Sequence, residues 1–525
     1  MHLTRRGAAV ALALALVACG ARSGLHEGGD PPELLSRDGV RGRSECVTDR
    51  DCDADACHGV RCDLGVCLPP RPVVCDDHDP CTADACDPAT GACRATRLAL
   101  DLDRDGVPGP IAGKKPGEPG SCGDDCDDAS ARAFPGNVEL CDGVDNDCNG
   151  VVDDEARFVP APGEAPRLVS DPSLALASAG GLAFGDTSTG YISAYSAQLA
   201  LGDTKLVVRE LSATGGADGP PVAINETAGD AFGGPVVWTG DRYGVAWSDR
   251  RDGNYEIYFN TLAPDGHKTG PDVRVTSAPD FSLSPTLVWN GSTFHLVWQD
   301  RRSGSFELYG RQLSLDGALL GDEVVLPSAG GAESPWLAGS SSGLALIDRI
   351  GDSQDSAIEL RRLGAGFVQE GPTLLLADHG RFEAPYVVKN GERYVALWVQ
   401  KDPHRVFGAV LGPSGALEVP ATELSPPGTQ SRGPIALPLG DRLVLLYSRQ
   451  SADGYELYSQ PLTGALVADG AEAQLTSSPG DDFAAAMTFG AAGDVGVLFN
   501  GRLPDAGGGL KSAVYFSRLV CAAGK

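Results

Sequence analysis

The chain is poor in basic residues, with 42 Lys and Arg against 71 Asp and Glu, and its formal net charge is −29. Binding of nucleic acid requires a basic face for the phosphates, so this composition argues against nucleic acid as a partner. The sequence also offers no Ser/His/Asp order, Gly-rich phosphate loop or metalloprotease pattern. No particular class of enzyme is therefore indicated.

The apolar run near the N-terminus has about a dozen residues, which is too short to span a bilayer. It follows two arginines and ends in small residues before Cys19, so residues 1–19 are predicted to be a signal peptide. The sequence LVAC at 16–19 resembles the bacterial lipobox, which implies diacylation of Cys19. The alternative is an ordinary secretory signal with a chance cysteine. We expect an exported lipoprotein, anchored to the outer membrane or cell surface, with residues 20–44 as a flexible tether.

Aromatic residues are nearly absent from residues 45–155, where Phe134 is the only one, and acidic residues outnumber basic ones by 26 to nine. Such a segment cannot bury enough apolar surface to fold through a hydrophobic core. It contains thirteen of the fifteen cysteines, which in an exported protein are expected to form disulfides and only in the cytoplasm would suggest zinc sites. The predicted disulfide cysteines are Cys46, Cys52, Cys57, Cys62, Cys67, Cys75, Cys81, Cys86, Cys93, Cys122, Cys126, Cys141, Cys148 and Cys521.

Two cysteine modules, residues 46–67 and 75–93, share the spacing Cys-x5-Cys-x4-Cys within the region 45–97. The second module resembles the CTDC repeat of slime-mould extracellular proteins, and this resemblance implies a disulfide-linked spacer without known chemistry. Cys62 has no counterpart in the second module, and Cys521 is the only cysteine beyond the acidic region. Parity alone therefore predicts a Cys62–Cys521 bridge.

Carboxylates dominate residues 98–156, where two stretches share one spacing. DLDRDG at 101–106 and DNDCNG at 145–150 both place oxygen-bearing side chains at positions 1, 3 and 5 before a glycine. This spacing is typical of loops that wrap oxygen ligands around Ca²⁺. Position 12 of the first loop is an alanine where an EF-hand has Glu, so the remaining ligands must come from elsewhere.

The order DxDxDG, DCDD and PGxxExCDGxDNDCNGxxDD is similar to the MopE-type metal-binding motif of surface lipoproteins, with a longer insert after the first loop. The family name suggests copper, but the segment contains neither His nor Met, and carboxylate and amide oxygens select Ca²⁺. The alternative is that the acids only form a solvated surface, although their excess charge would then repel strongly. The predicted calcium ligands are Asp101, Asp103, Asp105, Asp124, Asp125, Asp127, Asp128, Asp145, Asp147, Asn149 and Asp153.

The rest of the chain, residues 157–525, repeats with a period of about fifty residues, as 235–259 and 285–310 illustrate. Each copy has a stretch in which apolar residues occupy every second position, and this pattern indicates a half-buried strand. Turn signals divide each copy into four strands. Seven copies predict an all-β fold with a seven-bladed β-propeller, closed by residues 166–169, whereas an array of sandwiches would need about 100 residues per domain. The large residues that end the alternating strands are Tyr195, Trp247, Trp298, Ile347, Trp398, Tyr447 and Phe499.

Residues 247–266 resemble the TolB-type propeller repeat, and their charged residues recur from blade to blade. Because Asp249 with Arg251 recurs as Asp300 with Arg302, we expect these pairs to stabilise turns rather than to catalyse. We predict a propeller that is a binding platform for a protein or glycan, on a stalk stabilised by calcium and disulfides. The alternative is a surface hydrolase or lyase acting on glycan or peptide, whose sign would be one unrepeated cluster of Arg and carboxylates at the propeller mouth.

Overall fold

The computed structural model describes residues 46–52, 57–59, 61–68, 71–141, 144–153, 157–185, 190–225, 229–328, 330–490, 493–505 and 507–522. The chain forms two compact units, Met1–Thr96 and Arg97–Lys525, and each is described by itself. The predicted signal peptide, Cys19 and the tether lie outside the described residues. Within the described residues, no helix is long and apolar enough to cross a membrane.

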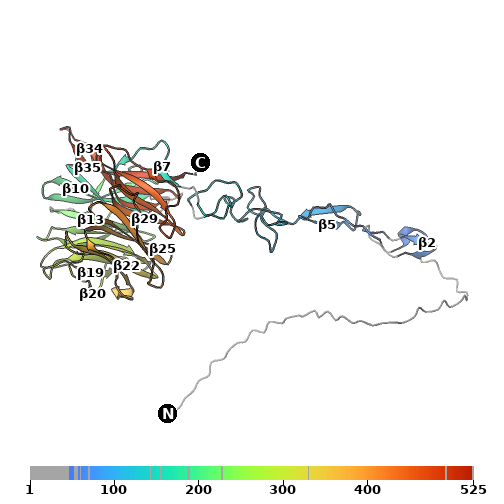
Figure 1. Ribbon diagram of the computed structural model, residues 1–525, viewed down its shortest axis with the longest axis horizontal. Coiled ribbons are helices and arrows are strands. Elements are labelled where there is room, and N and C mark those ends of the chain that lie inside the picture. The colour runs from blue at the N-terminus through green and yellow to red at the C-terminus, as the bar shows by residue number, and fades with distance from the viewer. Residues whose placement is uncertain are drawn as a thin grey trace, which may run out of the picture. The chain divides into compact units, whose positions relative to one another are not determined.

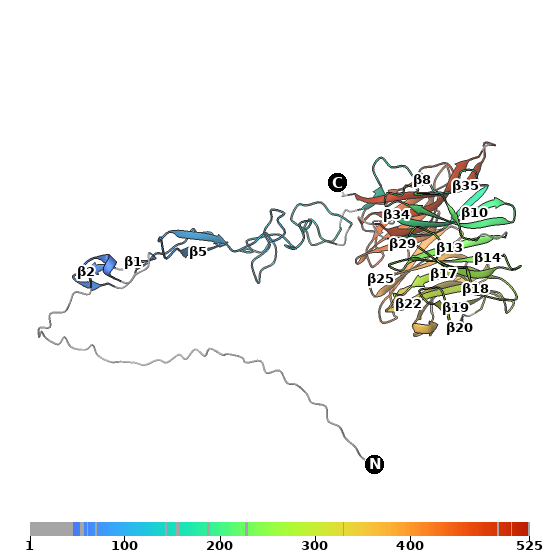
Figure 2. The same ribbon diagram turned by 180° about the vertical axis from the view of Figure 1, so that it is seen from behind.

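The described part of the first unit contains short two-stranded sheets, drawn in blue in Figures 1 and 2. Strand β1 pairs with β4, β2 with β3, and β5 with β6. The elements are the 3-10 helix η1 (Asp49–Asp51) and the strands β1 (His58–Gly59), β2 (Cys62–Asp63), β3 (Val66–Cys67), β4 (Arg71–Pro72), β5 (Thr82–Cys86) and β6 (Cys93–Arg97).

All fourteen cysteines predicted to form disulfides are disulfide-bonded. The pairs within the first unit include Cys46–Cys62, Cys52–Cys67, Cys57–Cys86 and Cys75–Cys93. The predicted Cys62–Cys521 bridge is therefore wrong, and Cys521 is bonded to Cys141 instead. The β2–β3 hairpin places Cys62 opposite Cys67, within reach of the cysteines that precede it in the same module. Counting the cysteines left without a counterpart could not reveal this local geometry.

The second unit contains the seven-bladed β-propeller, so the predicted all-β fold class is confirmed (Figures 1 and 2). Blades 1 to 6 are antiparallel four-stranded sheets whose strands follow one another along the chain. Blade 1 has β9 (Leu176–Phe184), β10 (Tyr191–Ala200), β11 (Asp203–Leu211) and β12 (Val222–Ala223); blade 2 has β13 (Ala231–Trp238), β14 (Tyr243–Asp249), β15 (Glu256–Leu262) and β16 (Val273–Arg274); blade 3 has β17 (Ser282–Trp289), β18 (Phe294–Asp300), β19 (Glu307–Leu313) and β20 (Leu319–Leu326). Blade 4 has β21 (Glu333–Ser340), β22 (Gly343–Gly351), β23 (Ser356–Leu363) and β24 (Leu374–Gly380), with the 3-10 helix η2 (Ala365–Phe367) before β24; blade 5 has β25 (Phe382–Asn390), β26 (Arg393–Gln400), β27 (Arg405–Leu411) and β28 (Leu417–Glu423); blade 6 has β29 (Ser431–Leu439), β30 (Arg442–Gln450), β31 (Tyr455–Leu462) and β32 (Ala473–Gln474).

Blade 7 is completed by residues that precede blade 1, which closes the ring. It contains β33 (Phe483–Phe489), β34 (Val495–Pro504) and β35 (Leu510–Ala522), and β35 pairs with both β7 (Arg157–Pro160) and β8 (Arg167–Leu168). The predicted closing stretch 166–169 covers β8, whereas the sequence analysis did not predict β7. Because β35 is 13 residues long, its edge accommodates two short strands.

The hydrophobic core lies between the facing sheets of neighbouring blades, as where residues of blades 1 and 2 form one cluster around Trp247. Trp247, Trp298 and Trp398 are at most 1% exposed. Each of these rings stacks on an aromatic ring of the following strand, at centroid distances of 6.0, 6.3 and 6.1 Å. Burial of a large apolar side chain stabilises the fold by about 1.5–3 kcal/mol, so the repeated aromatic position is a main source of blade stability.

Blade 4 departs from the register expected from the repeat. By its strand pairing, Leu344 occupies the position that Tyr243 has in blade 2. Asp348, rather than Ile347, is therefore the counterpart of the buried tryptophans. Asp348 is fully buried and forms an ion pair with Arg361, which is 1% exposed. Hydrophobic alternation could not reveal this register, because a paired charge replaces the large residue.

Candidate functional site

The first loop of the acidic segment is shaped by side chains that accept hydrogen bonds from its own backbone. Asp101 Oδ2 accepts from Gly106 N at 3.1 Å, and Asp103 Oδ1 accepts from Asp105 N at 3.2 Å. Asp105 Oδ1 accepts from Val107 N at 2.7 Å. Gly106 has a φ of 102°, a conformation that glycine adopts without the steric cost of a Cβ atom.

The second loop repeats this hydrogen-bond pattern. Asp145 Oδ2 accepts from Gly150 N at 2.8 Å, and Asp147 Oδ1 accepts from Asn149 N at 3.0 Å. Asn149 Oδ1 accepts from Val151 N at 2.8 Å, and the φ of Gly150 is 94°. The shared spacing at positions 1, 3 and 5 therefore encodes one loop conformation twice, of the kind that gathers oxygen atoms.

A third stretch adds a carboxylate to the first loop. One carboxylate oxygen from each of Asp103, Asp105 and Asp125 lies within 4.8 Å of the other two. The Oδ2 atoms of all three residues are buried and have no hydrogen-bond partner. Asp125 is 0% exposed, and burial, followed by the charges of Asp105 and Asp103, raises its pKa. Buried, unpaired carboxylates this close together are costly, so the arrangement fits a cation held by oxygen ligands.

Two glycines allow the third stretch to approach the first loop. A Cβ atom on Gly123 would lie 2.1 Å from a backbone carbonyl oxygen of the segment that follows the first loop. A Cβ atom on Gly109 would lie 2.8 Å from the Cβ of Asp128. Asp128 in turn shares a second carboxylate cluster with Asp101 and Asp103. The structure thus brings together five of the predicted ligands around the first loop.

Glu139 brings a carboxylate to the second loop that the sequence analysis did not select. Its Oε1 accepts from Asp147 N at 2.8 Å, while its Oε2 is buried without a hydrogen-bond partner. Glu139 is 6% exposed, and burial is the main reason that its pKa is raised. Asp153, which is 0% exposed, lies close behind the same loop. The signal available in the sequence was that this Glu belongs to the string PGxxExCDG of the MopE-type motif.

Two predicted ligands make other contacts. Asp124 is exposed and accepts from Gly117 N at 3.2 Å. Asp127 is also exposed and accepts from Ala129 N at 3.4 Å. Both carboxylates therefore support turns of the backbone, and spacing in the sequence could not distinguish them from the buried Asp125 between them.

A disulfide joins the second loop to the stretch that contains Asp125. Cys126 is bonded to Cys148, which lies between the second and third ligand positions of the loop. The cysteines beside these carboxylates are all disulfide-bonded, so they offer no thiolate to a soft metal. The donor set of both loops consists of oxygen atoms.

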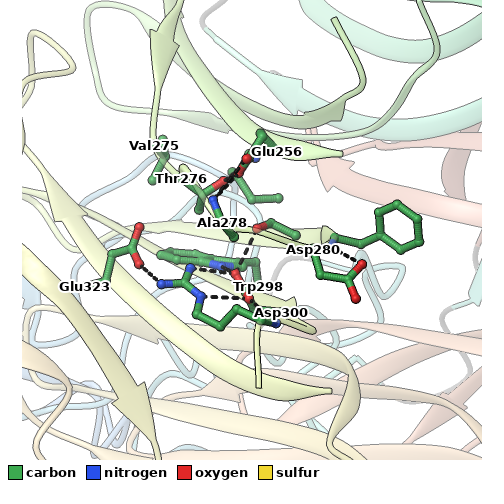
Figure 3. Close-up of polar contacts among 12 residues, drawn as sticks. Glu256, Val275, Thr276, Ala278, Asp280, Trp298, Asp300 and Glu323 are labelled. Carbon is green, nitrogen blue, oxygen red and sulfur yellow. Dashed lines mark hydrogen bonds and ion pairs between the residues drawn. The ribbon is translucent and has the colours of Figure 1, made fainter. Parts of the chain in front are cut away.

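The charged residues that recur in the propeller pin its turns, as predicted. In blade 3, Asp300 accepts from Trp298 Nε1 at 3.1 Å and from Arg302 Nη2 at 2.7 Å (Figure 3). Arg302 Nη1 donates to Glu323 at 2.6 Å. Burial opposes ionisation of Asp300, but hydrogen bonds from Arg302 and its other neighbours outweigh it and lower the pKa of Asp300. The pair at the same position of blade 2 makes the equivalent contacts.

The recurring glutamates have a similar role. Glu256 of blade 2, also drawn in Figure 3, is 0% exposed and accepts from Thr276 Oγ1 at 2.6 Å and from Ala278 N at 3.0 Å. Glu456 of blade 6 accepts from Thr476 Oγ1 at 2.7 Å. These buried carboxylates fix the segment that follows the outermost strand to the sheet of the same blade. Their role is therefore structural.

A cavity of about 450 Å³ lies between the inner strands of all seven blades. Its described lining includes no Asp, Glu, His, Lys or Arg side chain. The lining repeats from blade to blade, because each inner strand has a bulge near its start and five of the seven have proline there. These prolines are Pro235, Pro285, Pro335, Pro385 and Pro434.

A charged cluster that includes a histidine lies between blades 5 and 6. His404 Nε2 is 3.6 Å from Glu383 Oε1, and Lys401 Nζ is 2.5 Å from Glu383 Oε2. Arg432 Nη2 lies 3.3 Å from His404 Nδ1. Burial, followed by the charge of Arg432, lowers the pKa of His404. Spacing in the sequence gives no sign of this cluster, because Glu383 and Arg432 lie 21 and 28 residues from His404.

Two family models match parts of the chain. The model Cu-binding_MopE, described as "Putative metal-binding motif", matches residues 125–154, and the model Dicty_CTDC, described as "Dictyostelium (slime mold) repeat", matches residues 74–98. The resemblances to a MopE-type motif and to the CTDC repeat are thus confirmed. The lipobox and TolB-type resemblances stay predictions. No curated protein matches the chain.

Solved structures match the chain at low identity and with low TM-scores. The endosialidase of phage phi92 is 9% identical with a TM-score of 0.39, over 70% of this chain and 69% of that one. A study of two prolyl endopeptidases supplies a structure that is 15% identical with a TM-score of 0.39, over 69% and 53%. A thermostable family-43 glycoside hydrolase is 12% identical with a TM-score of 0.33, over 49% and 97%. With TM-scores this low, none of them bears on what this chain does.

Proposed function

We propose that this protein is an exported lipoprotein whose acidic segment binds Ca²⁺ and joins its N-terminal region to a β-propeller that acts as a binding platform. The observation that supports calcium binding most directly is the convergence of Asp103, Asp105 and Asp125, whose buried Oδ2 atoms have no hydrogen-bond partners. The number of disulfides supports export, because disulfides persist in oxidising compartments. Anchoring to the outer membrane or cell surface through Cys19 is the part of the proposal that rests on sequence alone.

Calcium suits this donor set better than copper. Hard cations such as Ca²⁺ prefer carboxylate and amide oxygens, whereas copper favours imidazole, thiolate and thioether ligands. Residues 98–156 contain neither His nor Met, and their cysteines are disulfide-bonded. A bound ion supplies two positive charges, which offset the repulsion among the carboxylates. The first site would use Asp101, Asp103, Asp105, Asp125 and Asp128, and the second Glu139, Asp145, Asp147, Asn149 and Asp153.

The cavity between the inner strands of the blades supports a binding role for the propeller. Hydrolysis of a glycan by general acid–base chemistry needs carboxylates or a histidine at the reacting bond. The described lining of this cavity instead repeats small and apolar residues from blade to blade. It includes Trp336 and Tyr386, whose ring centroids are 4.8 Å apart. Pockets of a few hundred Å³ with such linings are typical of sites that bind an apolar group. We propose a protein or glycan partner that docks on this ring.

A surface hydrolase or lyase is the second candidate, because His404 joins Glu383 and Arg432 in a charged cluster between blades 5 and 6. Hydrolysis of glycan and peptide substrates by the wild-type chain and by the His404→Ala variant tests it. A catalytic histidine contributes about 10²–10⁴-fold to the rate, so its removal would abolish detectable turnover. Equal or absent turnover in both proteins would eliminate this candidate.

Calcium titration of the full mature chain tests the calcium sites. We expect two ions per chain by calorimetry and metal analysis, and one ion for Asp125→Asn, because asparagine keeps the size of the side chain but removes its charge. Asp124→Asn is the matched control, since this exposed neighbour supports a turn and its variant should keep both ions. The proposal fails if the wild-type chain binds no calcium, or if the two variants bind alike.

A further inference from the structure

The second acidic loop is attached to the propeller on both of its sides. Cys141, which precedes the loop, is disulfide-bonded to Cys521 in β35 of blade 7. After the loop, Arg442 of blade 6 donates through Nη1 to the carbonyl oxygen of Val152, at 3.1 Å, and to that of Asp153. The loop that holds the second set of calcium ligands therefore connects blades 6 and 7.

Arg442 makes its contacts in a buried position. The residue is 6% exposed, its Nη2 pairs with Asp469 Oδ2 at 2.6 Å, and its Nε has no hydrogen-bond partner. If the loop moved away, the guanidinium would lose two carbonyl acceptors without gaining full access to water. Buried donors without partners are unfavourable, so the position of the loop affects the stability of blade 6.

The strand that closes the ring, β7, begins at Arg157, four residues after Asp153. In β7, Phe158 lies opposite Cys521 and is 2% exposed in the apolar core shared by blades 6 and 7. Its carbonyl oxygen accepts from Ser459 Oγ at 2.9 Å. A displaced loop would therefore pull on the strand that covers the edge of β35 and would expose that edge.

The loop keeps its shape only if its carboxylates tolerate one another. Glu139 Oε1 accepts from Asp147 N, and Glu139 Oε2 is buried near this acidic residue without a partner. Like charges in a partly buried position repel, and a divalent cation removes that repulsion. The second calcium site is thus placed where its occupancy determines how firmly the loop is held.

We infer that the second acidic loop is a calcium-dependent clamp on the propeller. The ion holds the carbonyl groups of Val152 and Asp153 against Arg442 and so keeps the closing strand β7 in place. This inference rests on the proposed calcium binding and adds its consequence, which is stabilisation of the ring. The hydrogen bonds described for the first loop stay within the acidic segment, so the two sites would differ in function although their loops are alike.

Tryptophan fluorescence separates the two regions in a melting experiment. All six tryptophans lie in blades 2 to 5, and the acidic segment contains none, so the signal reports the propeller alone. With calcium at about 100 times its dissociation constant, we expect the midpoint of thermal unfolding of the full mature chain to rise by about 3 °C relative to chelator.

Glu139→Gln and Asp103→Asn are a matched pair of variants. Each keeps one acceptor for its backbone hydrogen bond and loses the charge of its unbonded oxygen, so each should bind one calcium ion fewer. Glu139→Gln should lose the midpoint rise, whereas Asp103→Asn should keep it. Arg442→Gln should bind both ions but lose most of the rise, and because the rise is a difference within one protein, a general loss of stability does not obscure it.

The outcomes distinguish failure of the clamp from failure of calcium binding. If the wild-type chain binds no calcium, both the proposed function and the clamp are wrong. If ions bind but leave the tryptophan-detected midpoint unchanged, or if Glu139→Gln keeps the rise, the clamp is wrong and calcium binding stands. Loss of the rise in Asp103→Asn alone would also overturn the clamp.

Discussion

The acidic segment and the propeller belong to one compact unit but hold their shapes by different means. The segment has a single aromatic residue, Phe134, and depends on disulfides and on carboxylates bonded to backbone N–H groups. The propeller buries large residues in its blades and pairs buried carboxylates such as Asp300 with arginine. The segment therefore brings together carboxylates whose buried oxygens have no hydrogen-bond partner, whereas several buried carboxylates of the propeller have an arginine partner.

The largest loss of stability is expected when a buried tryptophan of the propeller is replaced. Trp298→Ala should lower the free energy of unfolding by about 3–5 kcal/mol, because it leaves a cavity in a fully buried position and removes a hydrogen bond to Asp300. Urea unfolding followed by the remaining five tryptophans measures this loss. Calcium binding should not change. A loss below about 1 kcal/mol would contradict the view that the repeated aromatic position stabilises the blades.

The sequence predicts regular features of this chain well. Seven blades follow from the spacing of Trp247, Trp298 and Trp398, because a core of constant size imposes the same large residue at a constant period. The conformation of the two acidic loops follows from spacing for a similar reason, since the side chains at positions 1, 3 and 5 bond to the loop's own backbone. In both cases the structural cause lies within one repeat or one loop.

Features that depend on partners far away in the chain could not be predicted from the sequence. Pairing of Cys141 with Cys521 spans 380 residues, and nothing local to either cysteine marks the other. Asp348 takes the place of a tryptophan only because Arg361 neutralises it, so alternation of apolar residues assigned the neighbouring isoleucine instead. Glu139 joins the second loop from six residues before it, where spacing within the loop gives no signal.

Replacing Cys141 and Cys521 together by serine should have the next largest effect. The disulfide restricts the unfolded chain over a long loop, so its loss should lower the free energy of unfolding by about 2–4 kcal/mol, measured by urea unfolding. Serine at Cys46 and Cys62 in the first unit is the control and should leave the tryptophan-detected transition unchanged. Equal effects of the two double variants would show that attachment of the acidic segment does not stabilise the propeller.

The smallest effect is expected from acid acting on one buried pair of the propeller. The pKa of Asp300 is lowered in the folded chain, so the stability supplied by its charge is present above its ordinary pKa and is lost as pH falls through the folded value. Each unit of lowering corresponds to about 1.4 kcal/mol. Asp300→Asn should therefore flatten the decline in stability below about pH 4, measured by urea unfolding at several pH values.

Asp316→Asn is the control for this pH series. Asp316 pairs with Arg242 at 2.9 Å but is 84% exposed, and exposed pairs contribute less than about 1 kcal/mol. Its variant should keep both the stability and the pH dependence of the wild-type chain. If Asp300→Asn also keeps the wild-type pH dependence, the buried arginine pairs of the propeller do not cause its acid sensitivity, and the contrast between internally paired and cation-dependent carboxylates would no longer separate the two regions.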